Sequence, residues 1–246
     1  MKVSIVTIAY NSETEIEATI ESVLRQDYEN LEYWIIDGCS KDKTVEKAEQ
    51  FRESFRQRNV DYHIVSEPDK GIYDAMNKGI ALAQGEIIGL INSGDRYEPD
   101  AVSTAVKTFR ESGCDLMYGN IAIYKSDGRC FEKKARQRKR YQTSRDWNHP
   151  TMFVKSELYK QYPFQNKGIH DDYAFYLKMR KQNRKIAVAD KRMAAFTMGG
   201  ASNQKNMKAA WKRIQDRYRF CYRENGYSRL YFLECLLIEA AKWILG

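Results

Sequence analysis

Apolar runs in the first 112 residues alternate with stretches whose apolar residues recur at helical spacing. The runs predict buried strands at 3–9, 31–36, 60–65 and 87–91. The intervening stretches predict helices from about residue 16 and over 44–55, 72–83 and 101–110. Ser12 and Glu15 form a candidate capping box for the first helix. This alternation predicts an α/β fold with a mainly parallel central sheet flanked by helices.

The pattern changes after residue 113. The expected elements are a hairpin of 116–124 and 129–134, a helix over 171–181, strand structure over 186–198, and helices from about 204. Between them, the segment 133–145 holds seven Lys/Arg residues and no acid. We therefore expect one α/β domain over 1–200 and a helical extension over 201–246.

Composition narrows the class of protein. Hydrophobic residues make up 43% of the 246 residues and charged residues 30%, which is a globular composition. A net charge of +8 favours an anionic partner: a nucleotide, a phosphate, a membrane surface or a nucleic acid. Five separated cysteines, none in a CxxC pair, argue against a disulfide framework or zinc site and favour a cytoplasmic location. The sequence predicts neither a signal peptide nor a membrane span.

Polar residues cluster where the first strands are expected to end, which is where ligands bind in such sheets. They are Thr7, Tyr10, Asn11, Asp37, Asp69, Lys70 and Asp95. Asp95 could reach a divalent cation on a diphosphate, or it could simply cap its own turn. Asp37 could accept a hydrogen bond from a base or ribose. Lys70 could neutralise phosphate, and Gly71 would allow close backbone approach.

A second group of candidates lies in the later half of the chain. Asp171 and Asp172 begin the expected helix after residue 170, so one could cap the helix while the other acts as a base. His149 precedes Pro150, and a lone histidine is more often structural than catalytic.

Three ordered segments carry a resemblance to a known family. They are VSIVTIAYNSETEIEATIESVLRQDYENLEYWIIDGCSKDKTVE, EPDKGIYDAMNKGIALAQGEIIGLINSGDRYEPDA and GIHDDYAFYLKM. Together they resemble family 2 glycosyltransferases of the GT-A fold, the nucleotide-diphospho-sugar transferases. The middle segment is similar to the bacterial enzymes that build capsular, exopolysaccharide or O-antigen chains. The resemblance implies inverting transfer of a hexosyl group, with 1–112 binding the donor and 113–200 the acceptor.

The resemblance also implies roles for individual residues. The nucleoside would be held by Thr7, Ala9, Tyr10, Asn11 and Asp37, and the ribose and phosphates by Asp69, Lys70 and Gly71. Asp172 matches the general base, and Asp171 stands where the family usually has Glu. His149 falls in the segment that lines the acceptor side.

One motif departs from the family pattern. The family often has Asp-Ser-Asp-Asp where this chain has Asn92-Ser93-Gly94-Asp95. Asp95 matches the last acid of the metal-binding motif, and Asn92 offers a neutral oxygen. The implied cofactor is Mg²⁺ or Mn²⁺, held by Asp95, the diphosphate and water, with reduced affinity.

Other interpretations stay open. A sugar nucleotidyltransferase would want a glycine-rich loop after the first strand, which this chain lacks. A degenerate relative would bind the sugar nucleotide without transfer. A nucleic-acid-binding module is disfavoured, because the segment 133–145 has only Tyr141 for stacking and matches no known reader motif. UDP is the expected nucleotide, with GDP and dTDP as alternatives, and the expected acceptor is a saccharide or lipid-linked saccharide.

The C-terminal stretch 230–245 is apolar around much of its expected helix but too short to span a bilayer. It could pack against the catalytic domain, form a homodimer contact, or dock on the inner face of the cytoplasmic membrane. The basic stretch 205–223 would assist docking on anionic lipid.

Overall fold

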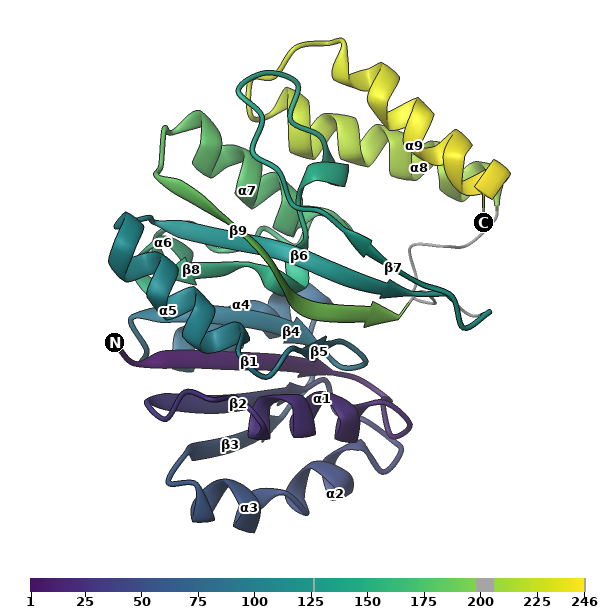
Figure 1. Ribbon diagram of the computed structural model, residues 1–246. Helices are drawn as coiled ribbons and strands as arrows, with labels where there is room; N and C mark the ends of the chain where they lie inside the picture. The colour runs from purple at the N-terminus through teal and green to yellow at the C-terminus, as the bar shows by residue number, and fades with distance from the viewer. Residues whose placement is uncertain (126, 198–205, 246) are drawn as a thin grey trace.

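The computed structural model describes residues 1–125, 127–197 and 206–245. Their strands form a nine-stranded mixed sheet in the order β3-β2-β1-β4-β8-β6-β9-β5, with β7 paired to β6 (Figure 1). The strands are β1 Val3–Ala9, β2 Leu31–Asp37, β3 Asp61–Ser66, β4 Ile87–Asn92, β5 Arg96–Tyr97, β6 Leu116–Tyr124, β7 Cys130–Lys133, β8 Phe153–Lys155 and β9 Ile186–Thr197.

The first four strands are mutually parallel, as the alternation of apolar runs and helices predicts. β1 lies between β2 and β4, with Val3 opposite both Leu31 and Ile87. The later half adds antiparallel neighbours, because short β8 runs against both β4 and β6. The predicted hairpin of β6 and β7 is confirmed, with Ile121 opposite Lys133. Ser126 of its turn and Met198 after β9 lie outside the described residues.

Helices cover both faces of the sheet. They are α1 Ile16–Leu24, α2 Thr44–Glu49, α3 Arg52–Gln57, α4 Ile72–Leu82, α5 Ala101–Ser112, α6 Ser156–Gln161, α7 Asp171–Lys181, α8 Met207–Asp216 and α9 Tyr231–Leu245. A π-helical segment, Arg217–Arg223, continues α8. One hydrophobic core joins the sheet to α1, α2, α3 and α5, and a second joins it to α4, α6 and α7.

Two local predictions are wrong. The predicted helix over 44–55 is two helices, because Gln50 and Phe51 donate their backbone N–H groups to Lys47 and Ala48 in a tightened turn. The predicted capping box is absent. The backbone oxygen of Ser12, rather than its side chain, accepts the N–H group of Glu15, while its hydroxyl lies 2.8 Å from Ser93 Oγ.

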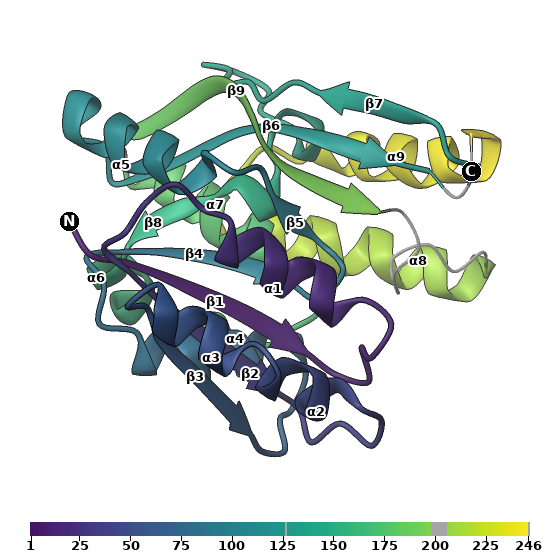
Figure 2. The same cartoon turned by 60° about the horizontal axis from the view of Figure 1, so that its bottom comes forward.

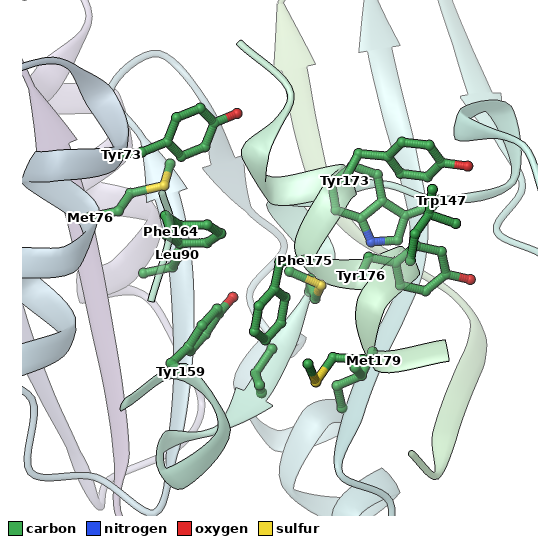
Figure 3. Close-up of a cluster of buried hydrophobic side chains, with 14 of the residues drawn as sticks. Tyr73, Met76, Leu90, Trp147, Tyr159, Phe164, Tyr173, Phe175, Tyr176 and Met179 are labelled. Carbon is green, nitrogen blue, oxygen red and sulfur yellow. The ribbon is translucent and has the colours of Figure 1, made fainter. Parts of the chain in front are cut away.

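The C-terminal helices extend the second core. Cys221, Tyr222, Tyr231 and Cys235 are buried in that core, whose aromatic cluster around Trp147, Tyr173 and Tyr176 is shown in Figure 3. In Figure 2, α8 and α9 lie beside each other on the side of the molecule away from β3. None of the described helices is both long and apolar enough to cross a membrane.

Candidate active site

A cavity of about 900 Å³ opens at the carboxyl ends of β1, β2, β4 and β9. Five of the residues expected to bind donor or metal line it, namely Tyr10, Asp69, Gly71, Asn92 and Asp95. They come from three separate loops, which the parallel strands bring to one edge of the sheet. The cavity is large enough for a small-molecule ligand with several polar groups.

One end of this cavity presents an aromatic ring beside a carboxylate. The side chain of Tyr10 is 62% exposed, so its ring face is open to a ligand. Asp69 lies over Gly38, where a Cβ atom would collide with the carboxylate and approach the Tyr10 ring to 3.2 Å. Asp69 Oδ1 accepts the backbone N–H of Gly71 at 2.8 Å, which fixes the carboxylate. An aromatic face beside a fixed acceptor suits a nucleoside.

Four other candidate nucleoside residues do not line the cavity. Thr7 and Ala9 are buried in β1, and the Thr7 hydroxyl lies 2.9 Å from Tyr33 Oη. Asn11 has a positive φ of 47°, and its Oδ1 accepts the Lys41 N–H at 2.8 Å. These contacts fix the loops beneath and beside the cleft.

Asp37 is the fourth of these residues and is completely buried at the end of β2. It accepts hydrogen bonds from the Ser40 backbone at 3.0 Å, from the Ser40 hydroxyl, and from the Ser66 hydroxyl at 2.6 Å. Its carboxylate therefore ties the loop after β2 to the end of β3.

The other end of the cavity contains the turn Asn92–Asp95. Asp95 is only 5% exposed, and no donor among the described residues hydrogen-bonds to its carboxylate. Burial first, and then the negative charge of Glu15, raises the pKa of Asp95 to about 8. Asn92 Oδ1 is likewise buried without a partner in the part of the chain that is described. These unpaired oxygens fit a divalent cation, which binds carboxylate and amide oxygens.

The described residues contain no group of three acidic, His or Cys side chains arranged to hold a metal. A cation here would therefore take its remaining oxygen ligands from the donor diphosphate and water. Lys70 is exposed and does not line the cavity, and its backbone N–H donates to Asp74 at 2.9 Å.

The two adjacent acids at the start of α7 have different surroundings. Asp171 is buried and accepts the backbone N–H of Lys167 at 3.0 Å, and burial raises its pKa. Asp172 Oδ1 accepts hydrogen bonds from the Tyr73 hydroxyl at 2.9 Å and from its own helix at Tyr173 N. Asp172 Oδ2 has no donor within the described ranges, so it is the oxygen available to take a proton.

Tyr73 connects the two regions, because α4 begins at the cleft beside Gly71 and carries Tyr73 to Asp172. His149 lies nearby and is half-buried, with its Nε2 atom enclosed and without a partner among the described residues; desolvation lowers its pKa, and the charge of Asp172 partly opposes that effect. Sequence reasoning missed Tyr73, although it stands in the quoted middle segment. It also assigned Glu15 only to capping.

A polar cleft at the carboxyl ends of the strands of an α/β sheet is typical of nucleotide-binding enzymes. The family model described as glycosyl transferase family 2 matches residues 4–196, and the chain belongs to this family.

Curated relatives are bacterial. Glycosyltransferase GlyG of Streptococcus pneumoniae is 29% identical over 198 residues, 71% of this chain and 65% of that protein. The putative teichuronic acid biosynthesis glycosyltransferase TuaG of Bacillus subtilis is 29% identical over 131 residues, 53% of this chain and 51% of that protein. The matches thus span between half and two thirds of these relatives. WfgD of Escherichia coli, named UDP-Glc:alpha-D-GlcNAc-diphosphoundecaprenol beta-1,3-glucosyltransferase, is 26% identical over 238 residues, 94% of this chain and 90% of that protein.

Solved structures share the fold. TarS 1–349 of Staphylococcus aureus in complex with UDP-GlcNAc superposes with a TM-score of 0.66 at 21% identity, over 99% of this chain and 79% of that chain. The mannosyltransferase PcManGT of Pyrobaculum calidifontis, in complex with GDP-Man and Mn²⁺, superposes with a TM-score of 0.65 at 18% identity, over 99% and 70%. The expected GT-A fold is confirmed.

Proposed function

We propose that this chain transfers a hexosyl group, with inversion, from a UDP-sugar to a hydroxyl of a saccharide or lipid-linked saccharide in surface-polysaccharide synthesis. The observation that carries this proposal is the single cleft that joins Tyr10 and Asp69 to the unpaired carboxylate of Asp95. A nucleoside bound beside Tyr10 and Asp69 would direct its diphosphate toward Asp95. WfgD, whose name specifies a UDP-Glc donor and a diphosphoundecaprenol-linked acceptor, supports this assignment along nearly its whole length.

Asp172 acts as general base in this proposal. Its Oδ2 takes the proton of the acceptor hydroxyl, and the acceptor oxygen forms a bond to the anomeric carbon. The bond from that carbon to the diphosphate breaks, and its electron pair leaves with the nucleoside diphosphate. Tyr73 holds Oδ1 so that Oδ2 faces the acceptor.

Asp95 and Asn92 would hold the Mg²⁺ or Mn²⁺ ion, whose positive charge stabilises the diphosphate leaving group. The half 1–112 would bind the donor, the half 113–200 the acceptor, and His149 would line the acceptor side without carrying the proton. The extension 201–246 would support the acceptor half.

The test uses UDP-, GDP- and dTDP-sugars with Mn²⁺ and an undecaprenyl-diphosphate-linked saccharide, and measures both donor hydrolysis and acceptor extension. Extension with a UDP-sugar is expected. Donor binding without extension or hydrolysis would indicate a degenerate relative, and release of pyrophosphate from UTP and a sugar phosphate would indicate a nucleotidyltransferase.

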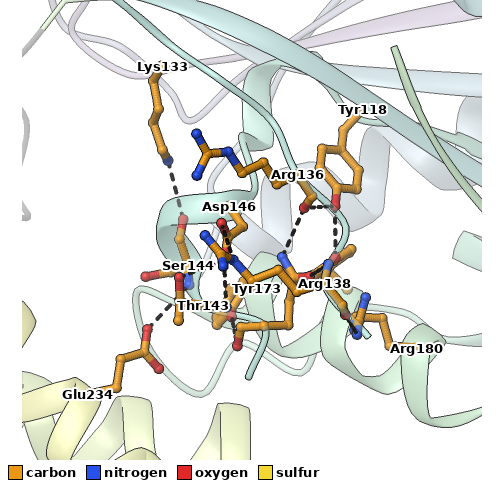
Figure 4. A network of polar contacts seen from close by, with 12 residues as sticks. Tyr118, Lys133, Arg136, Arg138, Thr143, Ser144, Asp146, Tyr173, Arg180 and Glu234 are labelled. Atoms are coloured by element: carbon orange, nitrogen blue, oxygen red, sulfur yellow. Dashed lines mark hydrogen bonds and ion pairs between the residues drawn. The ribbon is translucent and has the colours of Figure 1, made fainter. Parts of the chain in front are cut away.

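The surface of α9 suggests that the protein reaches a lipid-linked acceptor by docking on a membrane. Its acids face the protein: Glu239 pairs with Arg213 at 2.7 Å in the interior, and Glu234 accepts the Ser144 N–H at 3.4 Å (Figure 4). Two of its leucines face outward, with Leu233 57% and Leu237 68% exposed, while Leu236 packs against the core. A helix that only covers a core turns its apolar residues inward, so these two leucines form an additional exposed apolar surface.

A basic segment lies beside these leucines. Arg145 lines the same groove as Leu237, and Lys133 anchors the segment by donating to the Ser144 oxygen at 3.2 Å. Arg136, Arg138 and Tyr141 line the adjoining surface. Basic and apolar groups side by side suit an anionic lipid surface, so we assign this face to the inner side of the cytoplasmic membrane.

Co-sedimentation with vesicles containing anionic phosphatidylglycerol tests this docking. Binding is expected at low salt, with a loss at high salt and in Leu233→Glu/Leu237→Glu. Leu82→Glu on α4, where the leucine is 39% exposed, is the matched control and should bind normally. A protein that stays in the supernatant at low salt contradicts docking, and a concentration-dependent dimer lost in the same double variant would assign the face to a homodimer.

A further inference from the structure

The turn Asn92–Asp95 contains a single acid, Asp95, and a carboxylate from another part of the chain approaches the turn. Glu15 is the residue immediately before α1, and its side chain makes no capping bond. It lines the same cavity as Asn92 and Asp95. No described residue forms a hydrogen bond or ion pair with its carboxylate.

Gly94 lets Glu15 come this close. A Cβ atom at residue 94 would lie 2.9 Å from Glu15 Oε2, so an aspartate at this position would compete with Glu15 for the same space. The φ angle of Gly94 is +94°, which also disfavours a side chain. With glycine at position 94 the turn carries no side chain there, and the Glu15 carboxylate from just before α1 has room to approach.

One side chain of α1 ties the turn Asn92–Asp95 to that helix. The Thr19 hydroxyl accepts the Gly94 N–H at 2.9 Å and donates to the backbone oxygen of Asp95 at 2.8 Å. Glu15 precedes Thr19 by four residues, so these two hydrogen bonds hold the backbone of the Asn92–Asp95 turn next to the helix that begins directly after Glu15.

We propose that Glu15, beside Asp95, is a second carboxylate ligand of the divalent cation at the donor diphosphate. The inference rests on the proposed function, because the cation arrives with the donor. Two carboxylates facing one cavity repel each other, and a divalent cation between them turns that repulsion into attraction. The buried, unpaired Asp95 carboxylate and the unpaired Asn92 Oδ1 complete the set of protein oxygens.

Neighbouring acids show that Glu15 is not simply one of several surface carboxylates. Glu13 accepts the Lys43 N–H at 3.0 Å, and Glu17 forms an ion pair with Lys47. Both are turned toward the segment around α2. Glu17→Gln therefore removes the same charge from the same helix without touching the cavity, and it serves as the matched control.

Isothermal titration calorimetry of UDP, with EDTA or with Mn²⁺, tests the proposal on the full chain. Glu15→Gln should lose about tenfold or more of the Mn²⁺-dependent gain in UDP affinity. It should keep the metal-free UDP affinity within about twofold, and Glu17→Gln should match wild type in both conditions. The Mn²⁺ electron paramagnetic resonance signal in the presence of UDP gives a second, activity-independent measure of bound metal.

An unchanged Mn²⁺-dependent gain in Glu15→Gln would overturn the proposal while leaving the proposed function intact. Wild-type protein that binds UDP equally with and without Mn²⁺ would overturn the metal site as a whole. Wild-type protein that binds none of UDP, GDP and dTDP would overturn the proposed function itself. Equal losses in Glu15→Gln and Glu17→Gln would show a general charge effect and also contradict a specific ligand role.

Discussion

Two pairs of carboxylates in this molecule differ in their hydrogen-bond partners: groups of neighbouring loops hold Asp37 and Asp171, whereas Asp95 and the Oδ2 atom of Asp172 have no donor among the described residues. Asp37 accepts bonds from Ser40 and Ser66, and Asp171 accepts the N–H of Lys167, so both are occupied by the fold. Asp95 has no donor among the described residues, and Asp172 has donors only on Oδ1. A buried acid that the protein leaves unpaired is costly unless a ligand satisfies it.

The difference teaches how to separate structural from functional acids. All four were candidates from the sequence, since each stands at a strand end or a helix start. Their partners divide them: the oxygens that accept hydrogen bonds from loops tie those loops together, and the oxygens without donors are left for a ligand or a proton. The first three predictions below change one or two of these acids and ask whether stability or ligand chemistry responds, and the fourth concerns a histidine near Asp172.

The largest effect is expected for Asp172→Asn. An amide cannot take the acceptor proton, so the rate of transfer should fall by about 10²–10⁴-fold. Donor affinity should stay within about twofold, because Asp172 does not line the donor cavity. Initial rates with a saturating donor, together with calorimetric donor affinity, measure both quantities. Wild-type turnover in this variant would move the base to another residue.

Asp95→Ala should lower the affinity for UDP in the presence of Mn²⁺ by at least about tenfold. Its metal-free affinity should change little, because the contact between Asp95 and the donor passes through the cation. Calorimetry with Mn²⁺ or EDTA measures the two values. Equal Mn²⁺-dependent affinity in wild type and Asp95→Ala would mean that the open carboxylate is not a metal ligand.

Asp37→Asn should lower the free energy of unfolding by about 1–3 kcal/mol, since its amide group would face N–H and O–H donors. Asp95→Asn, measured without metal, should leave that free energy unchanged or higher, because it removes an unpaired buried carboxylate. Urea unfolding in EDTA compares the two variants. A similar loss of unfolding free energy in both variants would contradict the difference between Asp37, which is hydrogen-bonded, and Asp95, which is not.

The smallest effect concerns pH. Burial lowers the pKa of His149 below its usual value of 6.5, so the unfolded chain binds a proton there before the folded chain does. Stability therefore falls as pH drops below about 6.5, by at most about 1.4 kcal/mol per pH unit. His149→Gln should lose less stability than wild type between pH 7.5 and 5.5 in urea unfolding. The same loss in both proteins would contradict a lowered pKa of His149 in the folded chain.

Much of this fold could be predicted from the sequence. β1, β2 and β4 are mostly apolar runs, and burial on both faces of a parallel sheet produces that pattern, whereas β3 at the sheet edge is largely exposed or partly exposed. β5 and β8, with two and three residues, are too short to show any periodicity. Their places in the sheet depend on contacts with β9 and β4 that are far away in the chain.

The candidate site was predictable as a location but not in its details. The expected strand ends indicated where the cleft lies. That Asp37 is held by a hydrogen bond from the Ser66 hydroxyl, 29 residues away in the chain, could not be predicted from the local sequence. The sequence also placed Glu15 in a capping box, because its spacing from Ser12 is right for one. The backbone of Ser12 performs that task instead, which leaves the Glu15 side chain free to face Asp95.

The anomeric configuration of the product tests the central claim most directly. Purified protein, Mn²⁺, an α-linked UDP-hexose and an undecaprenyl-diphosphate-linked saccharide should yield UDP and an extended glycan. Nuclear magnetic resonance of the released glycan should show a new β-linkage, and Asp172→Asn should make at least about 10²-fold less of it. A new α-linkage, or equal product from wild type and Asp172→Asn, would contradict inverting transfer with Asp172 as its base.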